Sequence, residues 1–310
     1  MKTVLLIVLG VVVVVLVGSA IFLWTPDKSR AELEALYLRA PSDMTEVAGV
    51  TLHVRDDGPK DAPAIVMLHG FGSSLHTWEA WAQALKGEYR VIRLDLPGSG
   101  LSQPDATNTY TDAHSIDLIL ALMDQRGIAR ASLIGNSLGG RIAWTFAATH
   151  PDRTDKLILI SPDGFASPGF EYGKAPDVPP MLQAMQYVLP KFLLRMNLEP
   201  SYGDVAKLTP ATVDRYHDLM LAPGARAALL QRMKQTVLLE PEPLLKRIKA
   251  PVLLLWGERD AMIPFSNSAD YTNSIPNGRL VSLPRLGHVP HEEAPEESLV
   301  PVRAFLAERS

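Results

Sequence analysis

The sequence predicts an α/β protein in which helices flank a mostly parallel sheet. Short apolar runs recur along the chain, a pattern typical of parallel strands buried on both faces. Helical patterns separate these runs, and a turn containing glycine follows most of them. The expected strands cover residues 64–68, 91–95, 131–134, 156–161, 251–256 and 279–283, preceded by an alternating, exposed strand at 47–56. The expected helices cover residues 112–127, 138–150, 265–274 and 293–308.

The turns after the strands are where chemistry is expected, because open parallel sheets bind ligands at the carboxyl ends of their strands. Three of these turns supply Ser137, Asp260 and His288, in that order. The five turn motifs are His69-Gly70-Phe71-Gly72, Asp95-Leu96-Pro97-Gly98-Ser99-Gly100, Gly135-Asn136-Ser137-Leu138-Gly139-Gly140, Gly257-Glu258-Arg259-Asp260 and Gly287-His288.

The third motif contains G-x-S-x-G between a strand-like and a helix-like stretch. A serine on a sharp strand-to-helix turn has strained backbone angles, so small neighbours such as Gly135 and Gly139 are needed around it. The competing interpretation is a glycine-rich turn with an incidental serine. The context on both sides favours Ser137 as a nucleophile.

A serine hydroxyl needs a base to react at neutral pH, and His288 has the right chemistry. A carboxylate on the far side of the imidazole would fix its tautomer, which assigns Asp260 as the orienting acid. Asp163, at the end of the preceding strand, is the rival for that role. The sequence therefore predicts a triad of Ser137, Asp260 and His288.

His288 and His291 also form an H-x-x-H pair, which can indicate a metal site. The pair lacks a third ligand, so we expect no metal, and no cofactor is expected for serine hydrolysis. We expect His291 to cap a helix or to pair with Glu292 or Glu293.

Three residues near the motifs are expected to be structural. His69 ends a strand and should orient its own loop, and Asp95 should accept hydrogen bonds from the backbone of the turn at 97–100. Asn136 is interpreted only as a residue that tolerates the tight turn.

Over residues 46–310 the five ordered motifs resemble those of the α/β-hydrolase superfamily. With its apolar leading segment, the chain is most similar to the bacterial membrane-anchored lipases, esterases and phospholipases A, which include PlaF-type phospholipases A1. The resemblance implies an oxyanion hole built from two backbone N–H groups. Leu138, after the nucleophile, would supply one, and Phe71, after His69-Gly70, would supply the other.

Composition excludes several classes of function. The chain has 310 residues, is 47% hydrophobic and carries a net charge of −4, so it has no basic field for nucleic acid. It contains no cysteine, which rules out disulfides, thiolate metal sites and cysteine nucleophiles.

The first 25 residues are expected to form a transmembrane signal anchor. Residues 4–24 carry no charge and, as a helix, would span roughly 30 Å, the thickness of a bilayer core. A cleaved signal peptide is the alternative, with a small-residue site at 18–20. Trp24 lies where an interfacial anchor belongs and favours retention. We expect a single-pass protein of the bacterial inner membrane with its catalytic domain on the periplasmic side.

Residues 26–41 are expected to form an amphipathic juxtamembrane helix that begins with a capping box at Ser29. This helix could dock on the globular domain, lie on the bilayer, or pair with a second copy. A homodimer through the transmembrane and juxtamembrane helices is therefore a candidate assembly.

Between the two core segments, 42–164 and 248–310, the strand–helix alternation lapses over residues 165–247. This stretch is rich in proline, leucine and methionine and is predicted to form a helical lid. Flexible thioethers adapt to alkyl chains, so Met181, Met185, Phe192 and Met196 are candidate contacts for an acyl chain. The alternative is that they are ordinary core residues.

The sequence thus predicts a membrane-anchored serine hydrolase that cleaves acyl esters, such as phospholipid, lysophospholipid or monoacylglycerol, and releases a fatty acid. Two alternatives stay open. One is a carbon–carbon bond hydrolase of the same fold, and the other is a non-catalytic, membrane-tethered protein that binds its ligand under the lid.

Overall fold

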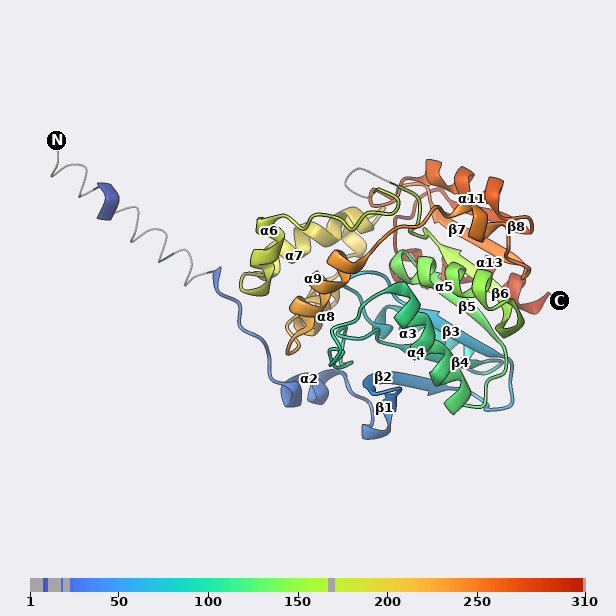
Figure 1. Ribbon diagram of the computed structural model, residues 1–310, viewed down its shortest axis with the longest axis horizontal. Helices are drawn as coiled ribbons and strands as arrows, with labels where there is room; N and C mark the ends of the chain where they lie inside the picture. Colours follow the sequence, from blue (N-terminus) through green and yellow to red (C-terminus); the bar gives the residue numbers. More distant parts are fainter. Residues whose placement is uncertain (1–7, 11–17, 19–22, 167–170, 309–310) are drawn as a thin grey trace.

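The computed structural model describes residues 8–10, 18, 23–166 and 171–308. Its centre is an eight-stranded sheet of order β1-β2-β4-β3-β5-β6-β7-β8, with helices on both faces (Figure 1). The strands are β1 (Met44–Val47), β2 (Val50–Asp57), β3 (Ala64–Leu68), β4 (Arg90–Leu94), β5 (Ala131–Asn136), β6 (Thr154–Ile160), β7 (Val252–Gly257) and β8 (Gly278–Leu283).

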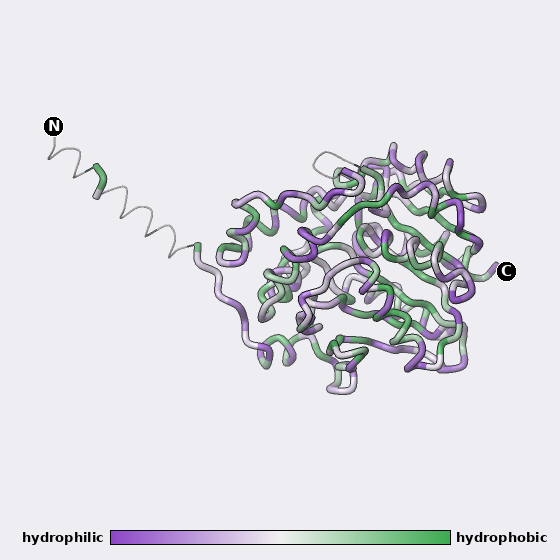
Figure 2. The backbone as a smooth tube through the Cα atoms, viewed as in Figure 1, coloured by the Kyte–Doolittle hydropathy of each residue, from purple (hydrophilic) through white to green (hydrophobic). Residues whose placement is uncertain are grey.

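The six strands from β3 to β8 pair in parallel, as the apolar runs predicted. Their side chains alternate between two apolar layers, one on each face of the sheet. On β5, Leu133 lies in one layer and Ile134 in the other, and on β7 Leu254 and Leu255 divide in the same way. Hydrophobic segments run through the middle of the globule, where the sheet lies (Figure 2). Burial on both faces therefore explains why these strands read as continuous apolar runs.

The helices that flank the sheet are α3 (Glu79–Leu85), α4 (Asp112–Gln125), α5 (Leu138–Thr149), α11 (Ser268–Ser274), α12 (Pro290–Glu293) and α13 (Pro295–Ala307). One layer contains residues of α4, α5 and α11, and the other contains residues of α3 and α13. The helix expected at 265–274 starts with a 3₁₀ turn, and the one expected at 293–308 corresponds to α13, with the short helix α12 just before it.

The strand expected at 47–56 is instead a hairpin. β1 and β2 pair antiparallel across a turn in which Ala48 and Gly49 have φ angles of 47° and 87°. β2 is mostly buried, because its polar residues His53 and Arg55 have partners inside the protein. The alternation with polar residues therefore reflects internal charge pairing and not exposure to solvent.

The segment between β6 and β7 is largely helical, in keeping with a lid. Its helices are α6 (Pro180–Gln183), α7 (Lys191–Leu198), α8 (Pro210–Met220), α9 (Ala225–Gln235) and α10 (Glu242–Leu245). Figure 1 shows α6 to α9 gathered on one side of the globule, the side on which α2 also lies.

The helix expected after the leading segment is α2 (Arg30–Tyr37). Ser29 caps it by accepting a hydrogen bond from the backbone N–H of Glu32 at 3.3 Å. Leu33 is fully buried in a cluster with lid residues, and Tyr37 donates a hydrogen bond to Asp218 of α8 at 3.0 Å. Of the three placements expected for this helix, the structure has it docked on the globular domain.

Within the described residues, no helix has both the length and the apolar character needed to cross a membrane. The transmembrane anchor expected at 1–25 lies mostly outside those residues, of which only 8–10, 18 and 23–25 are described.

Candidate active site

The strand-to-helix turn at Ser137 has the geometry of a nucleophile elbow. Ser137 has φ 54° and ψ −119°, a strained combination for a residue with a side chain, and α5 begins at the next residue. A Cβ on Gly135 would lie 2.2 Å from the oxygen of Gly139, and a Cβ on Gly139 would lie 2.2 Å from the oxygen of Leu68. Both glycines are therefore required by close backbone contacts.

His288 and Asp260 form a buried hydrogen-bonded pair. Nδ1 of His288 lies 2.8 Å from Oδ2 of Asp260, whose side chain is completely buried. Oδ1 of Asp260 accepts the backbone N–H groups of Met262 and Ile263, each at 2.8 Å. These bonds hold the carboxylate in place and leave Nδ1 of His288 as a donor, so Nε2 is available as a base.

Asp163, the rival acid, is engaged elsewhere. Its carboxylate pairs with the buried guanidinium of Arg141, which also pairs with Asp112 at 2.7 Å. Burial opposes the charge on Arg141, but the two aspartates outweigh it and raise its pKa above its usual range. Of the two candidate acids, the structure brings only Asp260 to His288.

Asn136 connects the elbow to the histidine loop, a role that sequence reasoning missed. Its side-chain amide donates to the backbone oxygen of Ile160 at 3.1 Å and to that of His288 at 2.9 Å. The residue next to Ser137 therefore fixes the backbone of His288, although the two are separated by 152 positions.

The loop after β3 carries Phe71, the second expected oxyanion donor. His69 is buried at the start of this loop. Its Nδ1 donates to the oxygen of Gly70 at 2.8 Å, and its Nε2 accepts the backbone N–H of Leu96 at 3.0 Å. Burial lowers the pKa of His69, which keeps the ring neutral and suits this donor–acceptor pair. His69 thus orients its loop, as expected.

Asp95 also holds the loop that carries Phe71 in place. It accepts the backbone N–H of Leu75 at 2.6 Å and that of Leu101 at 2.9 Å, and it pairs with Nδ1 of His53 at 2.8 Å. Burial opposes ionisation of Asp95, but the attraction of His53 outweighs it and holds the pKa of this carboxyl at about 2. Asp95 is structural, as expected, but the backbone N–H groups that it accepts are those of Leu75 and Leu101 and not those of the turn at 97–100.

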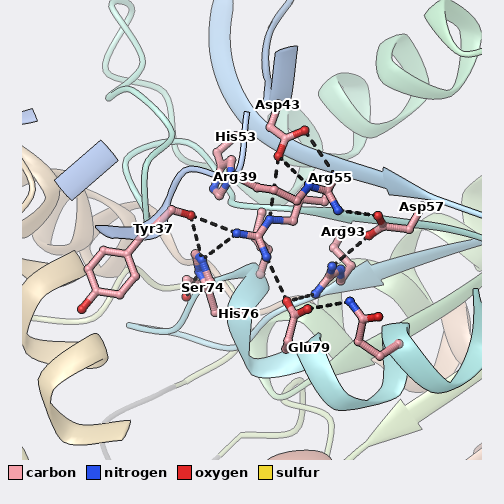
Figure 3. Close-up of polar contacts among 12 residues, drawn as sticks. Tyr37, Arg39, Asp43, His53, Arg55, Asp57, Ser74, His76, Glu79 and Arg93 are labelled. Atoms are coloured by element: carbon pink, nitrogen blue, oxygen red, sulfur yellow. Dashed lines mark hydrogen bonds and ion pairs between the residues drawn. The ribbon is translucent and has the colours of Figure 1, made fainter. Parts of the chain in front are cut away.

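A charged cluster behind this loop was not expected from the sequence (Figure 3). The guanidinium of Arg55 on β2 donates to Glu79 of α3 at 2.9 Å and to the backbone oxygen of Tyr37 at 2.9 Å. Arg93 on β4 donates to Glu79 at 2.7 Å and to Asp57 at 2.9 Å. The cluster joins α2, β2 and β4 to the first turn of α3, which follows the Phe71 loop.

His291 does not have the partners expected of it. It is buried, stacks on Trp78 with ring centroids 4.1 Å apart, and its Nε2 bonds to the hydroxyl of Thr77 at 3.0 Å. That hydroxyl donates in turn to Glu292 at 2.7 Å. Burial, followed by the nearness of His288, lowers the pKa of His291 to about 3. His291 is therefore a neutral core residue that reaches Glu292 only through Thr77.

Glu293 joins the histidine loop to the lid. Its carboxylate accepts the backbone N–H groups of Gly287 at 2.8 Å, Gly203 at 3.1 Å and Asp204 at 2.8 Å. The backbone N–H of His288 also donates to the oxygen of Ser201 at 2.8 Å. A lid segment is thus part of the support of His288.

Three of the four lid residues predicted to contact an acyl chain lie on the surface of the protein. Met181, Phe192 and Met196 are exposed, and Met185 is half-buried. None of them lines the apolar crevice between the Phe71 loop and the lid, because α8 and α9 supply that wall. The crevice is lined by Gly72, Ser73, Ser74, Gly98, Ser99, Gly100, Tyr216, Leu219, Met220, Ala225, Arg226 and Leu229. Its volume is about 20 Å³, enough for roughly one water molecule.

Comparison with known proteins gives a family and several relatives. Residues 63–295 match the alpha/beta hydrolase fold family. An AB hydrolase superfamily protein from Bacillus subtilis, YfhM, is 30% identical over 268 residues, which cover 80% of this chain and 91% of that protein. A 2-hydroxy-6-oxononadienedioate/2-hydroxy-6-oxononatrienedioate hydrolase from Comamonas testosteroni is 28% identical over 255 residues, covering 76% and 84%.

Among solved structures, the crystal structure of a membrane phospholipase A, described as a bacterial virulence factor, is similar over nearly the whole length. It is 25% identical with a TM-score of 0.73, and the match covers 99% of this chain and 98% of the other. The proteins similar to this chain therefore include a hydrolase of 2-hydroxy-6-oxo dienedioates and a membrane phospholipase A.

Proposed function

The chain belongs to the α/β-hydrolase family, and we propose that it is a membrane-anchored serine hydrolase that cleaves acyl esters of lipids through an acyl-enzyme. The observation that carries this proposal is the pair of His288 and Asp260, joined at 2.8 Å, with the backbone of His288 tied to the residue before Ser137. A serine on a strained elbow, and an imidazole that a carboxylate orients, are two of the parts that acyl transfer needs.

In the proposed first half-reaction, Nε2 of His288 takes the proton of the Ser137 hydroxyl as the oxygen attacks the ester carbonyl. Asp260 stabilises the imidazolium and keeps its own charge. The proton then passes from His288 to the leaving alcohol, and the acyl group stays on Ser137. Water, activated by the same imidazole, releases the fatty acid in the second half-reaction.

The charge that develops on the carbonyl oxygen needs preorganised donors. In the described part of the chain, the backbone N–H groups of Phe71 and Leu138 have no hydrogen-bond acceptor of their own. Leu138 opens α5, so the dipole of that helix adds to the stabilisation of an anion. Loss of one such donor costs about 3 kcal/mol of transition-state stabilisation in comparable sites.

Three observations support a lipid substrate. The crevice beside the Phe71 loop is walled by apolar side chains of the lid, including Leu219, Met220 and Leu229. The match to the membrane phospholipase A extends over 99% of this chain, a share large enough to include the uncharged leading run. An anchor at residues 1–25 would keep the site near bilayer lipids, with the catalytic domain on the periplasmic side of the inner membrane.

A carbon–carbon bond hydrolase is the second candidate, favoured by the relative that acts on a 2-hydroxy-6-oxo dienedioate. Such a substrate carries two carboxylates and needs cationic partners. Arg226 lines the crevice, but its guanidinium already pairs with Asp27 at 2.7 Å. The described lining of the crevice therefore offers no unpaired arginine to a dianion.

The test is a fluorophosphonate probe combined with a lipid panel. Wild type should be labelled and should release fatty acid from phospholipid, lysophospholipid or monoacylglycerol, whereas Ser137→Ala should do neither. Ser266→Ala, at an exposed serine, is the matched control and should behave as wild type. Cleavage of a 2-hydroxy-6-oxo dienoate without ester hydrolysis would favour the second candidate. A folded wild type that is not labelled would leave only ligand binding.

A further inference from the structure

The outer surface of the lid carries a group of exposed, large apolar side chains. We call this surface the lid face; it comprises α6, the turn that follows and α7. Met181 is 85% exposed and Met196 60%, and four further exposed apolar side chains lie close to them in the sequence. The lid face consists of Met181, Leu182, Tyr187, Phe192, Leu193 and Met196.

The start of the described globule is fastened to the lid face. The rings of Trp24 and Tyr187 stack with centroids 5.7 Å apart. The backbone N–H of Thr25 donates to the oxygen of Tyr187 at 2.9 Å, and the hydroxyl of Thr25 accepts the N–H of Leu189 at 3.1 Å. Trp24 also forms a β-bridge with Val188. Trp24, the last residue of the uncharged run, therefore packs against the lid.

The charges around the lid face are compensated. Lys191 pairs with Asp214 at 2.7 Å, and Arg195 pairs with Glu199 at 3.1 Å. A surface that bound an acidic partner would leave such cations free. The chemistry here is apolar and aromatic, with Trp24 and Tyr187 supplying rings that favour the boundary between lipid and water.

We propose that the lid face lies in the interfacial layer of a lipid bilayer, so that the lid and the anchor contact the same membrane. The inference rests on the proposed membrane-anchored hydrolase. If residues 4–24 enter the bilayer, the contacts of Trp24 and Thr25 hold α6 and α7 within a few residues of the point of entry. Figure 1 shows α6 and α7 at the edge of the globule on this side.

This placement puts the bilayer on the side of the enzyme where the lid and the crevice lie. Arg226 of α9 pairs with Asp27 just after the anchor and also donates to the backbone oxygen of Met185 at 3.3 Å. Arg226 lines the crevice as well, so one residue links the anchor, the lid face and the crevice wall. The lid face and the crevice wall are therefore held together through Arg226.

The first test uses the absence of cysteine in this chain. Full-length Leu182→Cys and Met196→Cys would each be labelled with a nitrobenzoxadiazole fluorophore and reconstituted into phosphatidylcholine vesicles. Val300→Cys, an exposed apolar position on α13, is the matched control. Acyl chains carrying a spin label should quench positions 182 and 196 by roughly twofold or more and leave position 300 unchanged.

Equal fluorescence at all three positions, with no quenching by lipid, would overturn the proposal. A second outcome would also overturn it: the label at position 196 is shielded from water but is not quenched by lipid, and two Met196→Cys copies form a disulfide. The lid face would then be an interface between two copies of the chain. Raising the salt concentration should leave the quenching unchanged, since the contact is apolar.

The second test measures activity. Leu182→Asp with Leu193→Asp should lower hydrolysis of phosphatidylcholine vesicles by roughly tenfold and leave hydrolysis of a soluble short-chain ester unchanged, and Val300→Asp should change neither. Equal vesicle activity in the double variant would overturn the proposal. Failure of the proposed function looks different: wild type would not cleave either ester or would not float with vesicles.

Discussion

The side-chain amide of Asn136 donates a hydrogen bond to the backbone oxygen of His288 over 2.9 Å. This contact crosses the site from the residue before the nucleophile to the proposed base. A second bond from the same nitrogen, to Ile160 at 3.1 Å, anchors the amide at the end of β6. Asn136 is therefore a positioning residue for the triad.

Asn136→Ala should lower kcat by about tenfold or more while changing KM little, because the base would lose its support and the crevice would not change. Two buried carbonyl groups would also lose a partner, and the free energy of unfolding should fall by about 1–3 kcal/mol. Steady-state kinetics and urea unfolding measure the two effects. Asn273→Ala, at an exposed asparagine, is the control. Wild-type kcat in Asn136→Ala would contradict the positioning role.

Asp260→Asn should lower kcat by about 10³–10⁴. The amide oxygen could still accept the N–H groups of Met262 and Ile263, so its NH₂ would face Nδ1 of His288. That donor favours the tautomer with the proton on Nε2, which cannot act as a base. Asp163→Asn is the matched control, since Asp163 pairs with Arg141, and it should retain most activity. The reverse ranking of the two variants would assign the acid to Asp163.

Much of the fold can be predicted from the sequence, because strands buried on both faces leave continuous apolar runs. The run at 64–68 coincides with β3, and the expected starts of the later strands lie within two residues of those observed. The turn at Ser137 can also be predicted from the sequence, because the close backbone contacts at Gly135 and Gly139 leave no room for a side chain and so require glycine. The order of motifs along the chain is enough to indicate Asp260 as the acid.

Other features depend on pairings that local sequence does not encode. Arg55 and Arg93 belong to strands, where a charged residue suggests exposure to solvent. Both are nevertheless buried, and both donate hydrogen bonds to Glu79. Likewise, the apolar spacing of α7 indicates an amphipathic helix but does not show which side packs, and in the structure Phe192 and Met196 are exposed.

Glu293→Gln should destabilise the histidine loop and the lid together. The wild-type carboxylate accepts three backbone N–H groups, from Gly287, Gly203 and Asp204. An amide would place its own NH₂ against one or two of them, at a cost of about 2 kcal/mol or more in the free energy of unfolding. Glu297→Gln, at a carboxylate in a partly exposed ion pair with Arg285, should cost well under about 1 kcal/mol. Equal unfolding midpoints for the two variants would count against this role of Glu293.

Stability should fall with acid from about pH 6, before the carboxylates titrate, because several histidines are buried in neutral form. Burial lowers the pKa of His76 from 6.5 to about 4 and that of His291 from 6.5 to about 3. As the pH falls below 6.5, the unfolded chain binds protons at these positions and the folded chain does not. Each histidine therefore removes about 1.4 kcal/mol of stability per pH unit until its folded pKa is reached. Burial lowers the pKa of His69 and His217 in the same direction.

His291→Phe isolates one of these contributions. Phenylalanine keeps a ring against Trp78 but has no site for a proton. Between pH 6 and pH 4, the slope of unfolding free energy against pH should be smaller in the variant by about 1.4 kcal/mol per pH unit. Above pH 7.5 the difference in stability between the two proteins should be independent of pH. Urea unfolding at half-unit intervals gives both slopes, and parallel curves below pH 6 would mean that His291 takes up its proton in the folded protein.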